Sequence, residues 1–403
     1  MLRFPLPALV FFLLGCVVGP SWADGPEIRR FCLASKTISP SLSLFIASDT
    51  ATQQAAIKRN QTIQEGKIFF SKQEGHALFH EMSMGQGDCL LTNLQEAMPL
   101  EAIAVRPGQG AFKRRAVTQR PSGGKQSYLP VVLFVQRNRS KLYGLIKQSS
   151  LQHLRPAPQP KETPTQQILN HATDPDLFLI YITCPAARNG LCDLRIKEQG
   201  RWLRDPATGQ LFTIPVLARA RRDQGGRPST IISRRTHINS DTPQGIYAIW
   251  GTVIDGGNST WHLTPRIDLD AALPPVNGQP YNINSFLLSK LIPDEAFDDY
   301  WVNEWPLAYS LGRIALRIAP GIFEAQQQNP IELQFGEKTY NPTHGCINTG
   351  DKQEKLVQAL VRAGVFAQEP LVTNKGMRKK WSVAAKLGKA FVIIKDRAPG
   401  EEM

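Results

Sequence analysis

The sequence is poor in cysteine, with six in 403 residues, and none of the six form a Cys-x-x-Cys pair. This absence argues against a paired-cysteine metal or redox site. A phosphate-binding glycine-rich loop and a nucleotide-binding fingerprint are also missing. We therefore predict neither a bound metal nor a cofactor.

Acidic residues are also few, 34 against 47 lysines and arginines, which gives a net charge of +13. A basic protein suits a polyanionic partner, such as nucleic acid, an anionic membrane surface or an anionic cell-wall polymer. The proportions of hydrophobic residues (42%) and charged residues (20%) are those of a folded globular protein and exclude wholesale disorder.

One long apolar run is present, from Leu6 to Val18, and no second candidate span follows it. Because Arg3 precedes this run and Ser21-Trp22-Ala23 follows it, residues 1–23 are predicted to be a secretory signal peptide. The alternative is an uncleaved anchor, but the run is shorter than the roughly 20 residues of a bilayer span. We expect an exported protein of the periplasm or cell envelope, with no stable membrane span after signal removal. Export argues against a nucleic-acid partner.

Removal of the leader takes Cys16 with it and leaves an odd number of cysteines. In an oxidising compartment, cysteines tend to pair. The simplest pairing joins Cys32 to Cys89 and Cys184 to Cys192, which leaves Cys346 as a thiol, although sequence alone does not determine the connectivity. A thiol in an exported protein is either a nucleophile or a buried, inert side chain.

The rest of the chain is predicted to be mostly β, of the α+β class. Short strand-like runs dominate, for example 177–182, 211–217, 245–250 and 389–394, whereas helical patterns are few and lie around 74–84, 353–363 and 382–387. A proline-rich stretch begins at residue 155. We therefore predict an N-terminal mixed domain over 24–155, a linker over 156–170 and a β-rich domain over 171–397.

The segment Pro342–Asp351 combines residues that suit nucleophilic chemistry. His344 and Cys346 are separated only by Gly345, so a tight turn can hold the thiol near the imidazole. A nearby imidazolium favours the thiolate, which is the attacking species. Backbone N–H groups of such a turn can form an oxyanion hole. The alternative is a turn that contains these residues by chance.

Residues 343–348, Thr-His-Gly-Cys-Ile-Asn, resemble the signature of the L,D-transpeptidase (YkuD-type) catalytic domain family. Residues 242–247, Thr-Pro-Gln-Gly-Ile-Tyr, resemble a second segment of that family, in the same order along the chain. The resemblance covers roughly residues 175–395. It implies a β-rich, sandwich-like domain that acts on the stem peptides of peptidoglycan.

The resemblance also implies a role for each motif residue. Cys346 would be the nucleophile that attacks the third residue of a stem tetrapeptide and expels D-alanine. The backbone amides of Gly345 and Cys346 would form the oxyanion hole, and His344 would orient or polarise. Thr343 and Asn348 would support the turn. An amine of a neighbouring stem, or water, would then resolve the acyl-enzyme.

The sequence departs from the family at the expected general base, an upstream histidine followed by glycine. The comparable segment, 316–321, has Ala319 at that position. Three explanations stay open: His344 is itself the base, His262 or His237 supplies it from elsewhere in the fold, or the domain has lost its activity. Arg234 and Arg235 are candidates to hold substrate carboxylates, with solvated surface arginines as the alternative.

The leading prediction is an exported, cysteine-dependent peptidoglycan L,D-transpeptidase. The alternatives are a peptidoglycan L,D-carboxypeptidase or endopeptidase, a catalytically impaired wall-binding protein, and a cysteine protease of envelope proteins. The sequence identifies no protein partner.

Overall fold

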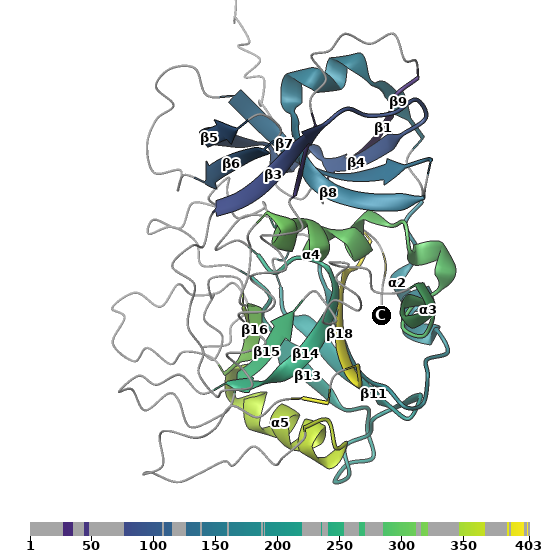
Figure 1. Cartoon of the computed structure of the whole chain (residues 1–403). Coiled ribbons are helices and arrows are strands. Elements are labelled where there is room, and N and C mark those ends of the chain that lie inside the picture. Colours follow the sequence, from purple (N-terminus) through teal and green to yellow (C-terminus); the bar gives the residue numbers. More distant parts are fainter. Residues whose placement is uncertain are drawn as a thin grey trace, which may run out of the picture.

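The structure is a computed structural model, and it describes residues 27–34, 44–47, 76–106, 109–114, 126–137, 139–158, 161–186, 188, 190–219, 235, 241–253, 266–270, 285–311, 316–320, 346–366, 385–386, 388–398 and 401. These residues form two β-sheets with a few short helices (Figure 1). The prediction of a mostly β chain of the α+β class is confirmed. The predicted signal peptide lies outside the described residues.

The first sheet has nine strands, in the order β5-β6-β3-β2-β8-β7-β4-β1-β9. An additional pairing of β5 with β7 closes six of the strands into a ring, from which β4, β1 and β9 extend. Its strands are β1 (Ile28–Cys32), β2 (Leu44–Ala47), β3 (His76–Met82), β4 (Cys89–Asn93), β5 (Met98–Arg106), β6 (Gln109–Arg114), β7 (Gln126–Val135), β8 (Ser140–Lys147) and β9 (Arg155–Ala157).

The second sheet also has nine strands, in the order β12-β11-β10-β18-β14-β15-β16-β17, with β13 paired to β11. At its centre, β10 and β18 run parallel and are buried along their whole lengths, as expected for continuous apolar runs. Its strands are β10 (Phe178–Cys184), β11 (Cys192–Glu198), β12 (Arg201–Trp202), β13 (Thr213–Val216), β14 (Gly245–Val253), β15 (Arg266–Asp270), β16 (Leu316–Ala319), β17 (Ile347–Asn348) and β18 (Ala390–Asp396).

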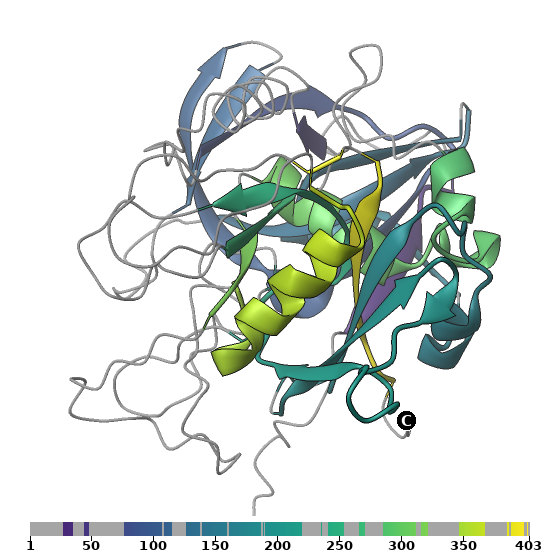
Figure 2. The same cartoon turned by 90° about the horizontal axis from the view of Figure 1, so that it is seen from below.

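The helices cover the second sheet and fill the space between the two sheets. Figure 2 shows α5 lying across the second sheet, on the side away from the first sheet. The α-helices are α2 (Thr165–Asn170), α3 (Ser285–Ser289), α4 (Tyr300–Ser310) and α5 (Gln353–Arg362). The 3-10 helices are η1 (Leu94–Glu96), η2 (Gln148–His153), η5 (Asp294–Ala296) and η6 (Gly350–Lys352). Among the described residues, no helix has the length and apolarity needed to cross a bilayer.

Helix α4 connects the two sheets, and every one of its residues is buried. Trp305 packs in the core beneath β14, whereas Trp301 packs on the other face of the second sheet with α2 and α3. Leu307 belongs to a third core with strands β4, β7 and β8 of the first sheet. A mostly apolar helix without a solvent-facing polar side must be buried all round, and α4 is buried in this way between the sheets, with Asn303 and Glu304 enclosed as well (Figure 1).

The predicted disulfides are confirmed. Cys32 bonds to Cys89 between neighbouring strands β1 and β4, and Cys184 bonds to Cys192 across the hairpin that joins β10 to β11. Cys346 belongs to neither disulfide. Two disulfides are typical of a protein that folds in an oxidising compartment.

The helical prediction around residues 74–84 is wrong, because β3 occupies this segment. It is an inner strand that pairs with both β2 and β6. Those partners come from segments that are distant in the sequence, so the local pattern could not reveal them.

All strands of the first sheet lie at or before residue 157, and all strands of the second lie after residue 177. The described part of the predicted linker, 156–170, is packed rather than extended through solvent. The Thr163 amide donates to Asp299 Oδ2 at 2.8 Å, and the Thr165 amide donates to Glu401 Oε1 at 2.6 Å.

Candidate active site

Cys346 stands immediately before β17 and is partly exposed. Thr343, His344 and Gly345, the first half of the predicted signature, lie outside the described residues. The second half is held between two segments of the fold. On one side β17 runs parallel to β16, and on the other Asn348 pairs with Leu217 through both backbone groups, at 2.8 and 2.9 Å.

Side-chain hydrogen bonds anchor the residues that follow the thiol. The Asn348 side chain is fully buried and accepts from the Gly350 amide at 2.7 Å. The Thr349 hydroxyl donates to the Ala319 carbonyl at 3.1 Å and lies 2.8 Å from the Gln353 side-chain oxygen. Gln353 in turn donates to the Ile318 carbonyl at 3.2 Å. These bonds anchor Asn348 and Thr349; the role of Asn348 in supporting the turn stays a prediction.

The β16 strand brings the predicted base position beside the thiol strand. Ala319 pairs with Asn348 in the parallel register, and Ile318 pairs with Ile347. Ile318 and Ile347 face the buried core, so Ala319 and Asn348 lie on the opposite face of the sheet. Arg317, two residues before Ala319 in β16, lies on that same face. Arg317 is buried, and the sequence analysis did not single it out.

The second predicted segment, residues 242–247, begins β14 and packs against α4. Gly245 has φ 136°, and a Cβ built on it would lie 2.8 Å from the Cβ of Trp305. Tyr247 stacks on the Trp305 ring with centroids 4.9 Å apart, and its hydroxyl donates to the Pro243 carbonyl at 2.6 Å. The glycine and the aromatic of this segment thus fit β14 to α4.

Gly245→Ala should lower the free energy of unfolding by about 1–3 kcal/mol, because the new methyl group overpacks the contact with Trp305. Gly209→Ala is the matched control, since Gly209 also has a positive φ (68°) but nothing within 4 Å of its Cβ position. Urea denaturation followed by circular dichroism measures both. Equal destabilisation by the two substitutions would show that the close approach to Trp305 is not what requires glycine.

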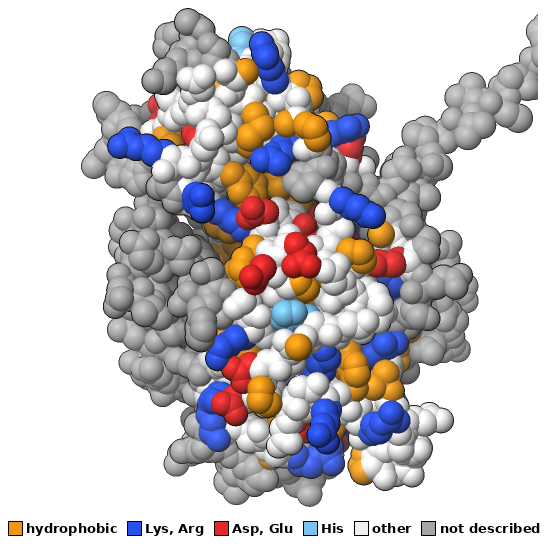
Figure 3. Space-filling model, turned by 90° about the vertical axis from the view of Figure 1, so that its right-hand side faces the viewer, with side chains coloured by type: hydrophobic (Ala, Val, Ile, Leu, Met, Phe, Trp, Pro, Cys, Tyr) orange, Lys and Arg blue, Asp and Glu red, His pale blue; other side chains and the backbone are white. Residues whose placement is uncertain are grey.

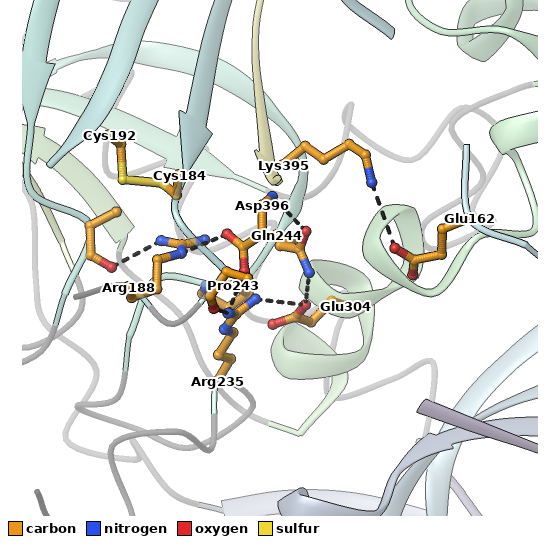
Figure 4. A network of polar contacts seen from close by, with 12 residues as sticks. Glu162, Cys184, Arg188, Cys192, Arg235, Pro243, Gln244, Glu304, Lys395 and Asp396 are labelled. Atoms are coloured by element: carbon orange, nitrogen blue, oxygen red, sulfur yellow. Dashed lines mark hydrogen bonds and ion pairs between the residues drawn. A yellow bond between two sulfur atoms is a disulfide. The ribbon is translucent and has the colours of Figure 1, made fainter. Parts of the chain in front are cut away.

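Arg235 lies in a buried ionic network, shown in Figure 4. Its guanidinium forms ion pairs with Asp396 in β18 and with Glu304 in α4, the second at 3.6 Å. Its backbone amide donates to Glu96 Oε1 of the first sheet at 2.5 Å. With a residue exposure of 6%, Arg235 holds protein carboxylates; a substrate-binding role stays a prediction that these contacts do not support. Arg234, His237 and His262 lie outside the described residues.

Glu304 is a titratable group of this network that no sequence pattern singles out. Its Oε2 accepts from the Gln244 side chain at 3.0 Å, and burial raises its pKa to about 7 although Arg235 acts to lower it. A carboxyl that is buried on a fully enclosed helix carries no local signal in the sequence, because Gln244 and Arg235 come from distant segments.

A shallow polar groove lies between α2 and residues 289–295. It is lined by Gln166, Asn170, His171, Asp294 and Glu295, among others. Figure 3 faces this side of the molecule and shows acidic side chains gathered near its middle. In Figure 1, β16 lies at the left of the second sheet, whereas α2 and α3 lie at the right, beyond β18. This groove is therefore separate from the segment that carries Cys346.

Within the part of the chain that the structure describes, no three histidine, cysteine or carboxylate side chains are grouped as metal ligands. No protein-family model, curated protein or solved structure matches this chain. The candidate site therefore rests on its residues and their surroundings.

Proposed function

We propose that this chain is an exported, cysteine-dependent acyltransferase of peptidoglycan, an L,D-transpeptidase with Cys346 as its nucleophile. The observation that carries the proposal is the sequence Thr-His-Gly-Cys-Ile-Asn at 343–348, in which the cysteine takes no part in the disulfides and is partly exposed. The anchoring of Asn348 and Thr349 supports it, because a nucleophile must be held in place to react efficiently.

The reaction we propose has two acyl-transfer steps. The Cys346 thiolate attacks the carbonyl of the third residue of a stem tetrapeptide, and D-alanine leaves as the amine, taking up a proton. The resulting thioester is then attacked by an amine of a neighbouring stem, which restores the thiol. Backbone amides of Gly345 and Cys346 stabilise the oxyanion. His344 orients or polarises the reacting groups, and Thr343 supports the turn.

Formation of the thiolate is the step for which Ala319 removes the expected base. His344 is the base candidate closest in sequence, and His262 and His237 are the others.

The predicted leader and the two disulfides support our proposal that the protein acts in the periplasm or cell envelope. The excess of lysine and arginine suits an anionic wall polymer. If water resolves the thioester instead of an amine, the same site is an L,D-carboxypeptidase or endopeptidase. Ala319 favours one further candidate, a wall-binding protein that retains the fold without catalysis.

A carbapenem should acylate the wild-type protein once, on Cys346, and should leave Cys346→Ala unmodified. Intact-mass measurement followed by peptide mapping detects the adduct. The strain that carries Cys346→Ala should also lose the cross-linked or trimmed muropeptides that the wild type produces. No adduct on Cys346, together with unchanged muropeptides, would contradict the proposal. Binding to purified wall that Cys346→Ala does not alter, without muropeptide change, would identify a wall-binding protein.

A further inference from the structure

The hairpin between β10 and β11 places an arginine inside the protein. Its ends are joined by the Cys184–Cys192 disulfide, and Arg188 lies at its tip with φ 48°, uncommon for a residue other than glycine. Loop tips normally project into solvent. The Arg188 side chain is instead 1% exposed and points inward, as Figure 4 shows.

The guanidinium of Arg188 joins two segments of the second sheet. Its Nε donates to Asp396 Oδ1 at 2.7 Å, and its Nη1 donates to the Ala218 carbonyl at 3.0 Å. The Ala218 carbonyl also accepts from the Thr242 amide at 3.3 Å, at the start of the second predicted segment. The planar guanidinium presents its donors to these two acceptors in a fixed geometry, whereas a lysine ammonium is a point charge on a flexible stem.

Ala218 follows directly after the residue that holds the Cys346 strand. Leu217 exchanges both backbone hydrogen bonds with Asn348, two residues beyond Cys346. Strand β17, directly after Cys346, is thus held by β16 on one side and by Leu217 on the other. Arg188 fixes the position of Leu217 through its hydrogen bond to the Ala218 carbonyl.

We propose that Arg188, held inward by the Cys184–Cys192 disulfide, is a positioning residue for the Cys346 turn. It acts through Ala218, Leu217 and Asn348, which hold the backbone that carries the Cys346 thiol. The inference rests on the proposed function in taking Cys346 as the nucleophile, but its effect on the thiol is measurable without a peptidoglycan substrate.

The test measures how fast iodoacetamide labels Cys346 in the full-length protein between pH 5 and pH 10, with peptide mapping to assign the label. Replacement of both cysteines of the hairpin, Cys184→Ser with Cys192→Ser, should lower the rate at pH 7 about tenfold and raise the pH midpoint by about one unit. The matched control is Cys32→Ser with Cys89→Ser, in the first sheet. The labelling rate of this control should stay within about twofold of the wild-type rate. Its disulfide joins β1 to β4 in the first sheet and takes no part in the Arg188 contacts.

Arg188→Lys and Arg188→Met separate positioning from general destabilisation. Arg188→Lys keeps the charge but not the fixed planar arrangement of donors, so its pH midpoint should lie between those of the wild type and Arg188→Met. If the hairpin cysteine variant does not fold, which circular dichroism shows, the two Arg188 variants decide the question. Folded variants with the wild-type pH profile would overturn the proposal.

Failure of the proposed function gives a different result. In that case the wild type would leave muropeptides unchanged, while the Arg188 and hairpin variants would still shift the labelling of Cys346. The positioning role would then stand for a thiol with another substrate.

Discussion

Trp305→Ala should lower the free energy of unfolding by about 3–5 kcal/mol. Trp305 is fully buried in α4, stacks on Tyr247 and meets Tyr309 edge-on with ring centroids 5.7 Å apart. Loss of the indole leaves a cavity where Trp305 contacts Gly245. Neither α4 nor β14 can move to fill this cavity without disturbing the side chains that pack on its other side. Urea denaturation followed by far-UV circular dichroism measures the loss.

Trp202→Ala is the control for the loss of a tryptophan as such. Trp202 lies in the short strand β12 at the end of the second sheet and is partly exposed, with its ring against Tyr181 and Lys197. It should cost clearly less than Trp305→Ala, because its surroundings are already open to water on one side. An equal or larger cost at Trp202 would contradict the central place given to α4.

The second large effect is a dependence of stability on pH that arises from Glu304. Burial raises the pKa of this carboxyl from its ordinary value of 4.5 to about 7. The folded state therefore holds a proton that the unfolded state has released, and stability falls as pH rises through this window. Its stabilising contribution is complete below about pH 4.5 and lost above about pH 7. At about 1.4 kcal/mol per pKa unit, the loss is about 3 kcal/mol.

Glu304→Gln should flatten the pH dependence of unfolding between pH 5 and pH 8, because the amide imitates the protonated carboxyl and can still accept from Gln244. Chemical denaturation at several pH values compares the variant with the wild type. Glu354→Gln is the matched control, since Glu354 lies on the exposed face of α5 and should leave the slope unchanged. An identical slope in Glu304→Gln and the wild type would remove Glu304 as the cause.

These two effects concern the same part of the molecule. Trp305 and Glu304 are neighbours in α4, and the network around Glu304 reaches Glu96 of the first sheet through Arg235. Through Glu96, the 3-10 helix η1 between β4 and β5 contacts Arg235, which precedes the Thr-Pro-Gln-Gly-Ile-Tyr segment in the sequence. A change in α4 should be felt in both halves of the chain, because three separate cores include its side chains.

Strong local patterns determined several features from the sequence alone. The apolar run over 177–182 is the central strand β10, and the run over 389–394 belongs to β18. The amphipathic pattern over 353–363 is α5. Each of these rests on residues close together in the sequence, so no knowledge of distant contacts was needed. The cysteine count left the connectivity open, and the structure contains the simplest pairing.

Only the tertiary structure decided the rest. Helix α4 has no polar face, so it shows no helical periodicity in its sequence and is recognised only between two sheets. Arg188 and Arg235 look like solvated arginines until Asp396, more than 150 residues away, is placed beside them. Likewise, Ala319 comes beside Asn348 only through the parallel pairing of β16 with β17. Burial and ion pairing depend on which distant segments share a sheet, and a linear pattern does not contain that information.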